Sequence, residues 1–575
     1  MRDAETSSPA RRWDRLHSLA VFIFLLNVVV VWKLFDVQVA KGALYSTMAA
    51  DEHQFWEKLL PKRGEVFVVD DGKPIQIITN KNQLTLYAVP ISIDKPGWTA
   101  KLLAETLGLD QIELEKKLSR PNDQYEIIKR KITDDEVAKV KDLKLPGLEF
   151  SEEPGRSYPD QNLFSHVTGF VGFSGDQKKG QYGIEGHWDD VLAGQTGYLK
   201  TDKDLTGRWI ASAGRSMEEA QDGSSLVLTL DRTIQFYACK QLEEAARKFK
   251  ASGGSLIVMN PMTGAVITMC GVPDFDPNIY NLVENARAYN NPAIFNDYEP
   301  GSIFKAVTMA GGLDANLITP DTTYDDTGIV DMVKYVIKNS DGKAHGITTM
   351  TGVLEQSLNT GTVFVSARMG LDLFRRYVKD FGFGQPAGIE LDTEGGGNIS
   401  SLEKKGQIFM ATASFGQGIT VTPLQMAAAY SAIANGGKLM RPYVVDQIIK
   451  PDGQVVKTQP EVIRQVISNR AAKVLTGMLV SVVKRGHSKK AGIPGYLIAA
   501  KTGTAQLAGP GGVYSKETIH SFIGYGPADD PKFVILARLD KPQGAEFAES
   551  SVAPLFNDVA RFIINYWKIQ PTERE

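Results

Sequence analysis

The chain has 575 residues, of which 43% are hydrophobic and 23% charged, and a formal net charge of −3. This length exceeds that of one ordinary domain, so we expect two or three folded units. The composition is that of a globular protein, and the near-neutral charge argues against a nucleic-acid-binding protein.

An apolar run at residues 19–35, LAVFIFLLNVVVVWKLF, is interrupted only by Asn27 and Lys33. Its length is at the short end for a transmembrane helix, and it would also suit a signal peptide or a buried core helix. We expect a retained anchor, because the small-residue cleavage candidate around Ala40 and Ala43 has a lysine between its alanines. Asn27 in mid-span suggests a contact with a membrane partner.

Positive charge is concentrated before this run. The tail at residues 1–18 contains four arginines, Arg2, Arg11, Arg12 and Arg15. The positive-inside rule then places the N-terminus in the cytoplasm and the rest of the chain beyond the membrane.

The region after the anchor shows no pattern of a catalytic site. Residues 36–60 read as an amphipathic connector, and residues 61–220 mix short strands, such as VFVV and LTLYAV, with short helices. Thr133 to Glu136 is a capping box that begins one of these helices. No cluster of carboxylates, histidines or cysteines with site spacing occurs there, so we interpret residues 61–220 as a structural pedestal.

Residues 221–575 have the pattern of an α/β domain. Strand-like SSLVLTLD is followed by a long amphipathic helix, then by two apolar runs joined by Pro-Met-Thr-Gly, which indicates a hairpin. Three further strands, YLIAAKTGTAQ, HSFIGYGPA and KFVILARLD, precede a closing helix. We predict a single sheet that collects both ends of the segment, with a helical region between them.

The two cysteines, Cys239 and Cys270, have no C-x-x-C or metal-ligand spacing and lie in apolar contexts. We expect each to be a small core residue. The histidines are scattered, so neither a metal nor another cofactor is expected.

Ser302 and Lys305 lie three residues apart, after a Glu-Pro-Gly breaker and at the head of an apolar run. On a helix they would share a face, where a desolvated lysine can act as the base that activates a serine. The same residues also fit an ordinary helix start in which Lys305 is a solvated surface residue. The spacing also occurs in SDGK at residues 340–343 and SLEK at residues 401–404, so it is weak evidence alone.

Two later stretches complete a possible site. In EQSLNTG, Ser357 and Asn359 are two residues apart. In AAKTGTA, Lys501 and the hydroxyls of its two threonines could hold a carboxylate, and Gly503 leaves room for a peptide backbone laid alongside. Each stretch alone fits an ordinary turn or strand end. Ser-x-Asn and Lys-Thr-Gly each occur once, however, and both follow Ser302 in order.

The order Ser-x-x-Lys, Ser-x-Asn, Lys-Thr-Gly is typical of the penicillin-recognising serine acyltransferases. The chain most resembles the class B penicillin-binding proteins, the membrane-anchored D,D-transpeptidases that crosslink bacterial peptidoglycan. Supporting stretches include KRGEVF, GRSYPDQNLFSHVTGFVG, GIEGHWDDVLAGQTG, FDPN and FGQGITVTPLQMAAAYSAIANGG. One departure is Asp70-Asp71-Gly72, where the family usually has an Asp-Arg-Asn-Gly-like turn.

The resemblance implies a fold and an anchor. It implies an α/β transpeptidase domain at residues 221–575, with a mixed sheet flanked by helices and a helical subdomain. A mixed α+β pedestal and a single transmembrane helix precede this domain, and the protein would lie in the inner (cytoplasmic) membrane of a bacterium.

The resemblance also implies residue roles. Ser302 would attack the penultimate D-alanine carbonyl of a stem peptide, Lys305 would take its proton, and Ser357 with Lys501 would relay a proton to the leaving amine. The backbone N–H groups of Ser302 and Thr504 would form the oxyanion hole. The substrate-binding residues would be Asn359 for an amide, Thr502 and Thr504 for the carboxylate, and Gly503.

The implied ligands are stem peptides ending in D-Ala-D-Ala, with β-lactams as inhibitors. A membrane glycan polymerase is the implied partner, along with other division or elongation proteins, and residues 299–328 look more like the division-associated branch. A D,D-carboxypeptidase or a β-lactamase with an added base such as Glu355 is an alternative. A sensor or scaffold that binds β-lactams or wall peptides without turnover is the non-enzymatic alternative.

Overall fold

A computed structural model of the chain describes residues 15–42, 54–120, 123, 125–175, 177–202, 216–332, 335–508 and 514–572. The predicted cytoplasmic tail up to residue 14, and Ala43 of the cleavage candidate, lie outside the described residues. The chain divides into two compact units, one of Met1–Lys62 with Gly194–Asp222 and one of Arg63–Ala193 with Gly223–Glu575.

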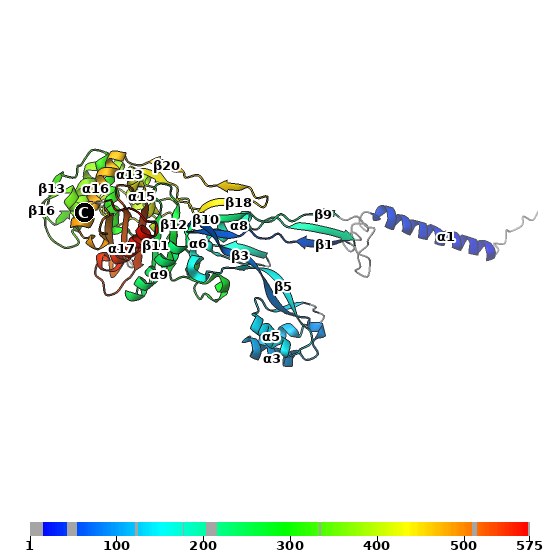
Figure 1. The fold of residues 1–575 in the computed structure, drawn as a ribbon. Coiled ribbons are helices and arrows are strands. Elements are labelled where there is room, and N and C mark those ends of the chain that lie inside the picture. The colour runs from blue at the N-terminus through cyan, green and yellow to red at the C-terminus, as the bar shows by residue number, and fades with distance from the viewer. Residues whose placement is uncertain are drawn as a thin grey trace, which may run out of the picture. The chain divides into compact units, whose positions relative to one another are not determined.

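The first unit contains one long apolar helix and a small sheet (Figure 1). The helix is α1 (Arg15–Phe35), which continues into a π-helical turn, η1 (Asp36–Ala40). The antiparallel sheet has the order β1–β8–β9, with β1 (Gln54–Leu59), β8 (Gly197–Asp202) and β9 (Ser216–Glu218).

Within the described residues, His17–Ala40 is the one stretch long and apolar enough to cross a membrane, which confirms the single N-terminal apolar helix. Phe24 and Trp32 are 67% and 66% exposed, which contradicts the alternative of a buried core helix. Asn27 donates its side-chain amide to the carbonyl of Ile23 at 2.8 Å, so this donor is satisfied within α1.

A seven-stranded sheet dominates the pedestal region of the second unit. Its order is β19–β18–β10–β2–β3–β4, and β5 also pairs with β3. The strands are β2 (Val66–Asp70), β3 (Lys73–Ala88), β4 (Glu126–Lys129), β5 (Leu148–Ser157), β10 (Ser225–Asp231), β18 (Val445–Ile449) and β19 (Val455–Lys457). SSLVLTLD is β10, which is parallel to β2, so our assignment of this strand to the sheet of the catalytic domain is wrong.

Three helices pack beside the far end of β3 around a separate apolar cluster. They are α3 (Pro96–Leu107), α4 (Gln111–Leu118) and α5 (Asp134–Asp142). The predicted capping box is confirmed: Thr133 accepts from the Glu136 N–H, and the Glu136 carboxylate accepts from the Thr133 N–H.

The catalytic region is built on a five-stranded sheet of order β12–β11–β23–β22–β21. Its strands are β11 (Gly253–Met259), β12 (Val266–Val272), β21 (Ala499–Ala508), β22 (Tyr514–Gly526) and β23 (Phe533–Asp540), and every pairing is antiparallel, whereas we expected a mixed sheet. The predicted hairpin is confirmed as β11–β12. We expected strands from both ends of residues 221–575 to join one sheet. Apart from β10 this is confirmed, because β11 and β12 lie in the same sheet as β21, β22 and β23.

Helices cover both faces of this sheet, so its strands are apolar on both sides. Along β11, Leu256 and Val258 pack in one cluster with α9 (Arg232–Lys248) and α17 (Ala548–Tyr566). Ile257 and Met259 pack in the other cluster with α15 (Pro423–Ala434) and α16 (Asn469–Arg485). This alternation is that of a strand buried between two layers.

The helical region lies between β12 and β21 in sequence. Besides α15 and α16 it contains α10 (Lys305–Asp314), α11 (Met350–Glu355), α12 (Asn359–Met369), α13 (Leu371–Asp380) and α14 (Gln407–Ala413). Short antiparallel pairs accompany them: β13 (Thr323–Asp326) with β16 (Gly346–Thr349), β14 (Ile329–Asp331) with β15 (Val336–Lys338), and β17 (Lys438–Met440) with β20 (Val462–Gln465). The pedestal region adds α6 (Ser165–Thr168), β6 (Phe170–Ser174) with β7 (Gln177–Gln181), α7 (Gly183–His187) and α8 (Asp189–Leu192).

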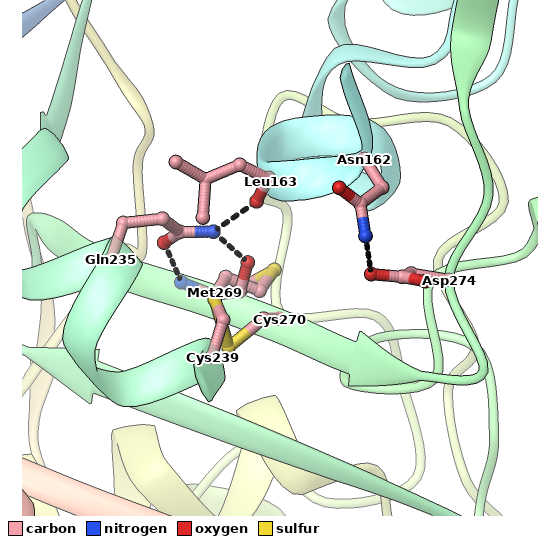
Figure 2. Close-up of a disulfide and its surroundings, with 7 residues drawn as sticks. All are labelled: Asn162, Leu163, Gln235, Cys239, Met269, Cys270 and Asp274. Carbon is pink, nitrogen blue, oxygen red and sulfur yellow. Dashed lines mark hydrogen bonds between the residues drawn. A yellow bond between two sulfur atoms is a disulfide. The ribbon is translucent and has the colours of Figure 1, made fainter. Parts of the chain in front are cut away.

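A disulfide joins Cys239 of α9 to Cys270 of β12 (Figure 2). Both cysteines contribute to the apolar cluster as predicted. We expected them to be core residues without a covalent bond, so the disulfide was not predicted from the sequence. Gln235, one turn earlier on α9, accepts from the Met269 N–H at 3.0 Å and donates to the Met269 carbonyl at 2.9 Å. Gln235 therefore pairs with the edge strand β12 as another strand would, and the disulfide lies beside this contact.

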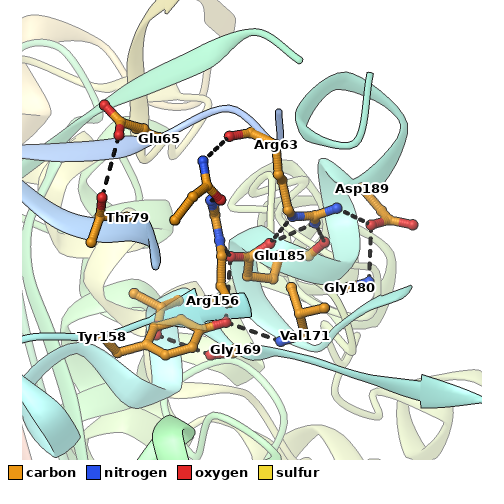
Figure 3. Close-up of polar contacts among 12 residues, drawn as sticks. Arg63, Glu65, Thr79, Arg156, Tyr158, Gly169, Val171, Gly180, Glu185 and Asp189 are labelled. Atoms are coloured by element: carbon orange, nitrogen blue, oxygen red, sulfur yellow. Dashed lines mark hydrogen bonds and ion pairs between the residues drawn. The ribbon is translucent and has the colours of Figure 1, made fainter. Parts of the chain in front are cut away.

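A buried ion-pair network holds the start of the pedestal (Figure 3). Glu185 is fully buried, and its two carboxylate oxygens accept from the Arg156 Nε at 2.6 Å and the Arg63 Nε at 2.7 Å. Arg63 also reaches Asp189 at 2.7 Å. Burial alone would raise the pKa of Glu185, but the two guanidinium groups reverse this and hold the pKa below its usual value.

Glu185→Gln should destabilise the protein by about 3–5 kcal/mol, because it leaves the buried Arg156 without its counter-ion and Arg63 with Asp189 alone. The depressed pKa also means that the stabilisation is present at neutral pH and is lost as the pH falls through the folded-state pKa. Thermal unfolding would measure both effects. Glu113→Gln, at a carboxylate that is 70% exposed, is the control that should leave the midpoint unchanged. Equal midpoints for the two variants would contradict the network's role.

Candidate active site

Ser302 lies in a 3₁₀ turn, η6 (Gly301–Phe304), that leads directly into α10. Gly301 has φ +57°, and a Cβ on it would lie 3.2 Å from the Ala505 Cβ of β21. Its N–H donates to the Gly416 carbonyl at 3.0 Å. Only glycine adopts this conformation so close to a strand without strain, and the turn thereby places half-buried Ser302 beside β21.

Lys305 is the first residue of α10 and is fully buried. Its Nζ donates to the carbonyl oxygen of Ser357 and lies 3.2 Å from the Ser357 Oγ. The alternative of a solvated surface lysine is therefore wrong.

Lys501 reaches the same hydroxyl from β21. Its Nζ is also fully buried and lies 2.9 Å from the Ser357 Oγ. Ser357 therefore bridges the two amines, and it does so with φ +57°, an unfavourable backbone conformation for a residue with a side chain.

The pKa values of Lys305 and Lys501 are both lowered, chiefly because the two amines are buried. Burial, with the nearby charge of Lys501, holds the pKa of Lys305 well below its usual value, and burial lowers the pKa of Lys501 to about 7. In the part of the chain that the structure describes, no carboxylate forms an ion pair with either amine. The lowered pKa values favour the neutral form of the amines, which is the form that a general base requires.

The hydroxyl of Ser302 has fewer contacts than that of Ser357. Its hydroxyl makes no hydrogen bond to any described residue, so the predicted direct contact with Lys305 is absent. The structure brings Lys305, Ser357 and Lys501 together and leaves the Ser302 hydroxyl unengaged on the adjoining turn. Catalytic hydrogen bonds often tighten only when substrate binds.

Asn359 begins α12, and its Nδ2 donates to the Lys338 carbonyl of β15 at 2.8 Å. Sequence reasoning missed this neighbour and also Asn339, whose side chain accepts from the Asn359 N–H at 3.0 Å. The one local signal is the apolar Leu358 at the N-cap of α12, since a helix without its own cap needs a partner from elsewhere.

Thr502, Gly503 and Thr504 lie on β21, which is an edge strand of the five-stranded sheet. A Cβ on Gly503 would lie 2.5 Å from the Ser521 Oγ and 3.0 Å from the Pro300 carbonyl oxygen, so a larger residue would displace the turn that holds Ser302. Among the described strands β21 pairs only with β22, so its other edge is where an extended peptide could add as a further strand.

The matches to protein families decide the identity. Residues 254–561 match the model of the penicillin-binding protein transpeptidase domain, and residues 58–228 match that of the penicillin-binding protein dimerisation domain. The chain belongs to the penicillin-binding proteins. The family resemblance and the expected fold are thereby confirmed, and the dimerisation-domain match falls on the region that we interpreted as a pedestal.

Relatives of this penicillin-binding protein align over most of its length. The chain is 33% identical to stage V sporulation protein D of Bacillus subtilis over 571 residues, 98% of this chain and 87% of that protein. It is 29% identical to peptidoglycan D,D-transpeptidase FtsI of Escherichia coli K12 over 480 residues, 82% of this chain and 78% of that protein. Penicillin-binding protein 3 of Mycobacterium tuberculosis, crystallised with aztreonam, superposes with a TM-score of 0.69 at 26% identity, covering 90% of this chain and 98% of that one.

We propose Ser302 as the nucleophile, Lys305 as its base and Lys501 as a proton donor, and on this assignment reaction with a penicillin should have a bell-shaped pH profile. The rate should rise as Lys305 loses its proton and fall as Lys501 loses its own near pH 7, well below the usual lysine pKa of about 10.4. Stopped-flow measurements with a fluorescent penicillin would give the profile. Lys501→Arg keeps its charge at every pH used, so this variant should lack the alkaline limb whatever its maximal rate. A wild-type rate that keeps rising into the ordinary lysine range would contradict the assignment.

Proposed function

We propose that the chain is a serine-type peptidoglycan D,D-transpeptidase, which crosslinks stem peptides ending in D-Ala-D-Ala. The observation that carries this proposal is the Ser357 hydroxyl, which lies 3.2 Å from one buried lysine amine and 2.9 Å from another, beside the turn that bears Ser302. Two buried amines with lowered pKa values, joined through one hydroxyl, form a route for a proton next to a nucleophile.

In the proposed acylation, the Ser302 Oγ attacks the carbonyl carbon of the penultimate D-alanine while Lys305 takes the hydroxyl proton. The carbonyl oxygen becomes an oxyanion, which the backbone N–H groups of Ser302 and Thr504 stabilise. When the amide bond breaks, Ser357 gives a proton to the departing D-alanine amine and receives one from Lys501. The product is an ester on Ser302.

Substrate positioning follows from the edge strand. An extended donor peptide adds to β21, Thr502 and Thr504 hold its terminal carboxylate, and Asn359 bonds its backbone amide. Gly503 keeps the strand surface clear. An amine from a second stem peptide then attacks the ester, regenerates the Ser302 hydroxyl and completes the crosslink without any external energy source.

Inhibition by β-lactams follows from the same geometry, because their strained amide resembles the donor terminus. The support comes from Mycobacterium tuberculosis penicillin-binding protein 3, whose structures contain aztreonam and ampicillin.

A β-lactamase-like reaction needs a further base that activates water, and Glu355 is the nearest candidate in sequence to Ser357. Its carboxylate accepts instead from Ser481 and, at 3.0 Å, from the Arg485 Nε. These contacts favour a structural role for Glu355 and a long-lived acyl-enzyme. A D,D-carboxypeptidase, in which water replaces the acceptor amine, is the second candidate.

Brief exposure to a labelled penicillin should leave a stable adduct on the peptide that contains Ser302, and Ser302→Ala should show none. Intact mass followed by peptide mapping measures this. Rapid release of hydrolysed drug would indicate a hydrolase, and folded protein without any adduct would leave a binding scaffold. A stem-peptide donor offered with and without an amine acceptor separates transfer from hydrolysis to water.

We further propose that α1 is a single-pass anchor in the inner membrane, with residues 1–18 in the cytoplasm and the catalytic domain outside. The arginines of the tail support this orientation. The Cys239–Cys270 disulfide supports it independently, because disulfides persist mainly in oxidising compartments outside the cytoplasm. We propose an anchor at residues 19–35, a connector at 36–60, a pedestal at 61–220 and a transpeptidase domain at 221–575, from which β10, β18 and β19 join the pedestal sheet.

We also propose a division-associated role beside a separate membrane glycan polymerase.

In intact cells, neither cysteine should react with a thiol reagent unless the protein is first reduced. The chain has only two cysteines, so a gel shift after labelling in denaturant reports directly on their pairing. Cys239→Ser leaves Cys270 unpaired and should label without reduction, which provides the positive control. Two reactive thiols in the unreduced wild type would contradict the oxidised, extracytoplasmic placement.

A further inference from the structure

The N-terminus of α12 is capped from a distant segment. Leu358, at the N-cap position, has no side chain that could accept a hydrogen bond. Instead the first two N–H groups of the helix, those of Asn359 and Thr360, donate to the Oδ1 of Asn339 at 3.0 and 3.3 Å. A side chain that follows β15 therefore does the work of the missing local cap.

The orientation of Asn339 is fixed by Asp326. Asn339 is 4% exposed, and its Nδ2 donates to the two carboxylate oxygens of Asp326 at 3.1 and 2.8 Å. An ionised carboxylate can only accept, so the amide nitrogen must face Asp326 and the amide oxygen must face α12.

Asp326 is itself held in place. It is 1% exposed, and it accepts from the Thr360 hydroxyl at 2.7 Å, the Gly328 N–H at 3.1 Å and the His345 Nδ1 at 2.8 Å. Asp326 therefore contacts α12 twice, directly through Thr360 and indirectly through Asn339.

These contacts converge on the Ser-x-Asn motif. The side chain of Asn359 donates to the carbonyl of Lys338 at 2.8 Å, so Lys338 and Asn339 hold both its side chain and its main chain. Ser357, two residues earlier, keeps its strained φ of +57° only if the segments on either side are fixed. The position of the hydroxyl between the two lysines thus depends on where α12 begins.

We propose that Asp326 and Asn339 are positioning residues of the acylation reaction, which place Ser357 and Asn359 by capping α12. This inference rests on the proposed transpeptidase function. Neither residue touches the reacting atoms, and each acts through the start of α12. Misplacement of a reacting group by about 1 Å can reduce a rate about 100-fold, so a small shift of α12 is sufficient for a large effect.

Asn339→Ala should reduce the second-order rate constant for acylation by a penicillin by about 10- to 100-fold. The rate of bond formation should fall because Ser357 moves, and the dissociation constant of the penicillin should rise because Asn359 moves. Stopped-flow acylation of the full-length protein, over a range of penicillin concentrations, measures the rate of bond formation and the dissociation constant separately. Val559→Ala in α17, a buried position on the other face of the sheet, is the control for general destabilisation and should leave both values within about twofold.

A double-mutant cycle keeps the test decisive if the alanine variant does not fold. Asn339→Asp is nearly isosteric but sets two carboxylates face to face, and adding Asp326→Asn restores an amide–carboxylate pair in reversed order. The double variant should acylate faster than Asn339→Asp alone. If the double variant shows the product of the two single-variant losses in acylation rate, the side chains act independently and the proposal is overturned. An Asn339→Ala variant that acylates at the wild-type rate would also overturn it. If the wild type itself forms no adduct, the proposed function fails instead.

Discussion

The hydroxyl of Ser357, held between the buried amines of Lys305 and Lys501, is the constraint on which the catalytic region depends. The three residues come from α10, the junction before α12 and the edge strand β21, so the site exists only when the helical region is packed against the sheet. Burying two amines without a described carboxylate partner is unfavourable for folding, and the apolar layers on both faces of the sheet offset that cost.

Much of the site could be predicted from the order of three short motifs. A serine and a lysine at helical spacing, a serine and an asparagine two apart, and Lys-Thr-Gly on a strand each carry little information alone, but together they define one chemistry. The α/β architecture and the β11–β12 hairpin were accessible for a similar reason, since apolar periodicity and turn residues are local signals. The helix that begins after Thr133 was predictable from its own capping residues.

What the sequence could not predict is the choice of non-local partners. An apolar strand such as β10 fits any sheet, and its register against β2 is decided only when the whole sheet assembles. Cys239 and Cys270 are 31 residues apart, and their pairing depends on how α9 lies across the hairpin. Asn339 caps a helix that begins 20 residues later, so no local pattern reveals it. Strand direction was missed likewise, because apolar runs buried on both faces read alike in parallel and antiparallel sheets.

The pedestal sheet has a practical consequence for anyone who wishes to produce the enzyme in parts. Its strands β18 and β10 come from the same stretch of sequence as the catalytic sheet, whereas β2, the neighbour of β10, follows Arg63. Residues 63–193 and 223–575 form one compact unit. A fragment that starts at β10 would expose the apolar edge that β2 normally covers, and such an edge promotes aggregation. A truncated enzyme should therefore keep the pedestal together with β1, which is the partner of β8. Removal of α1 is a safer truncation than removal of the pedestal.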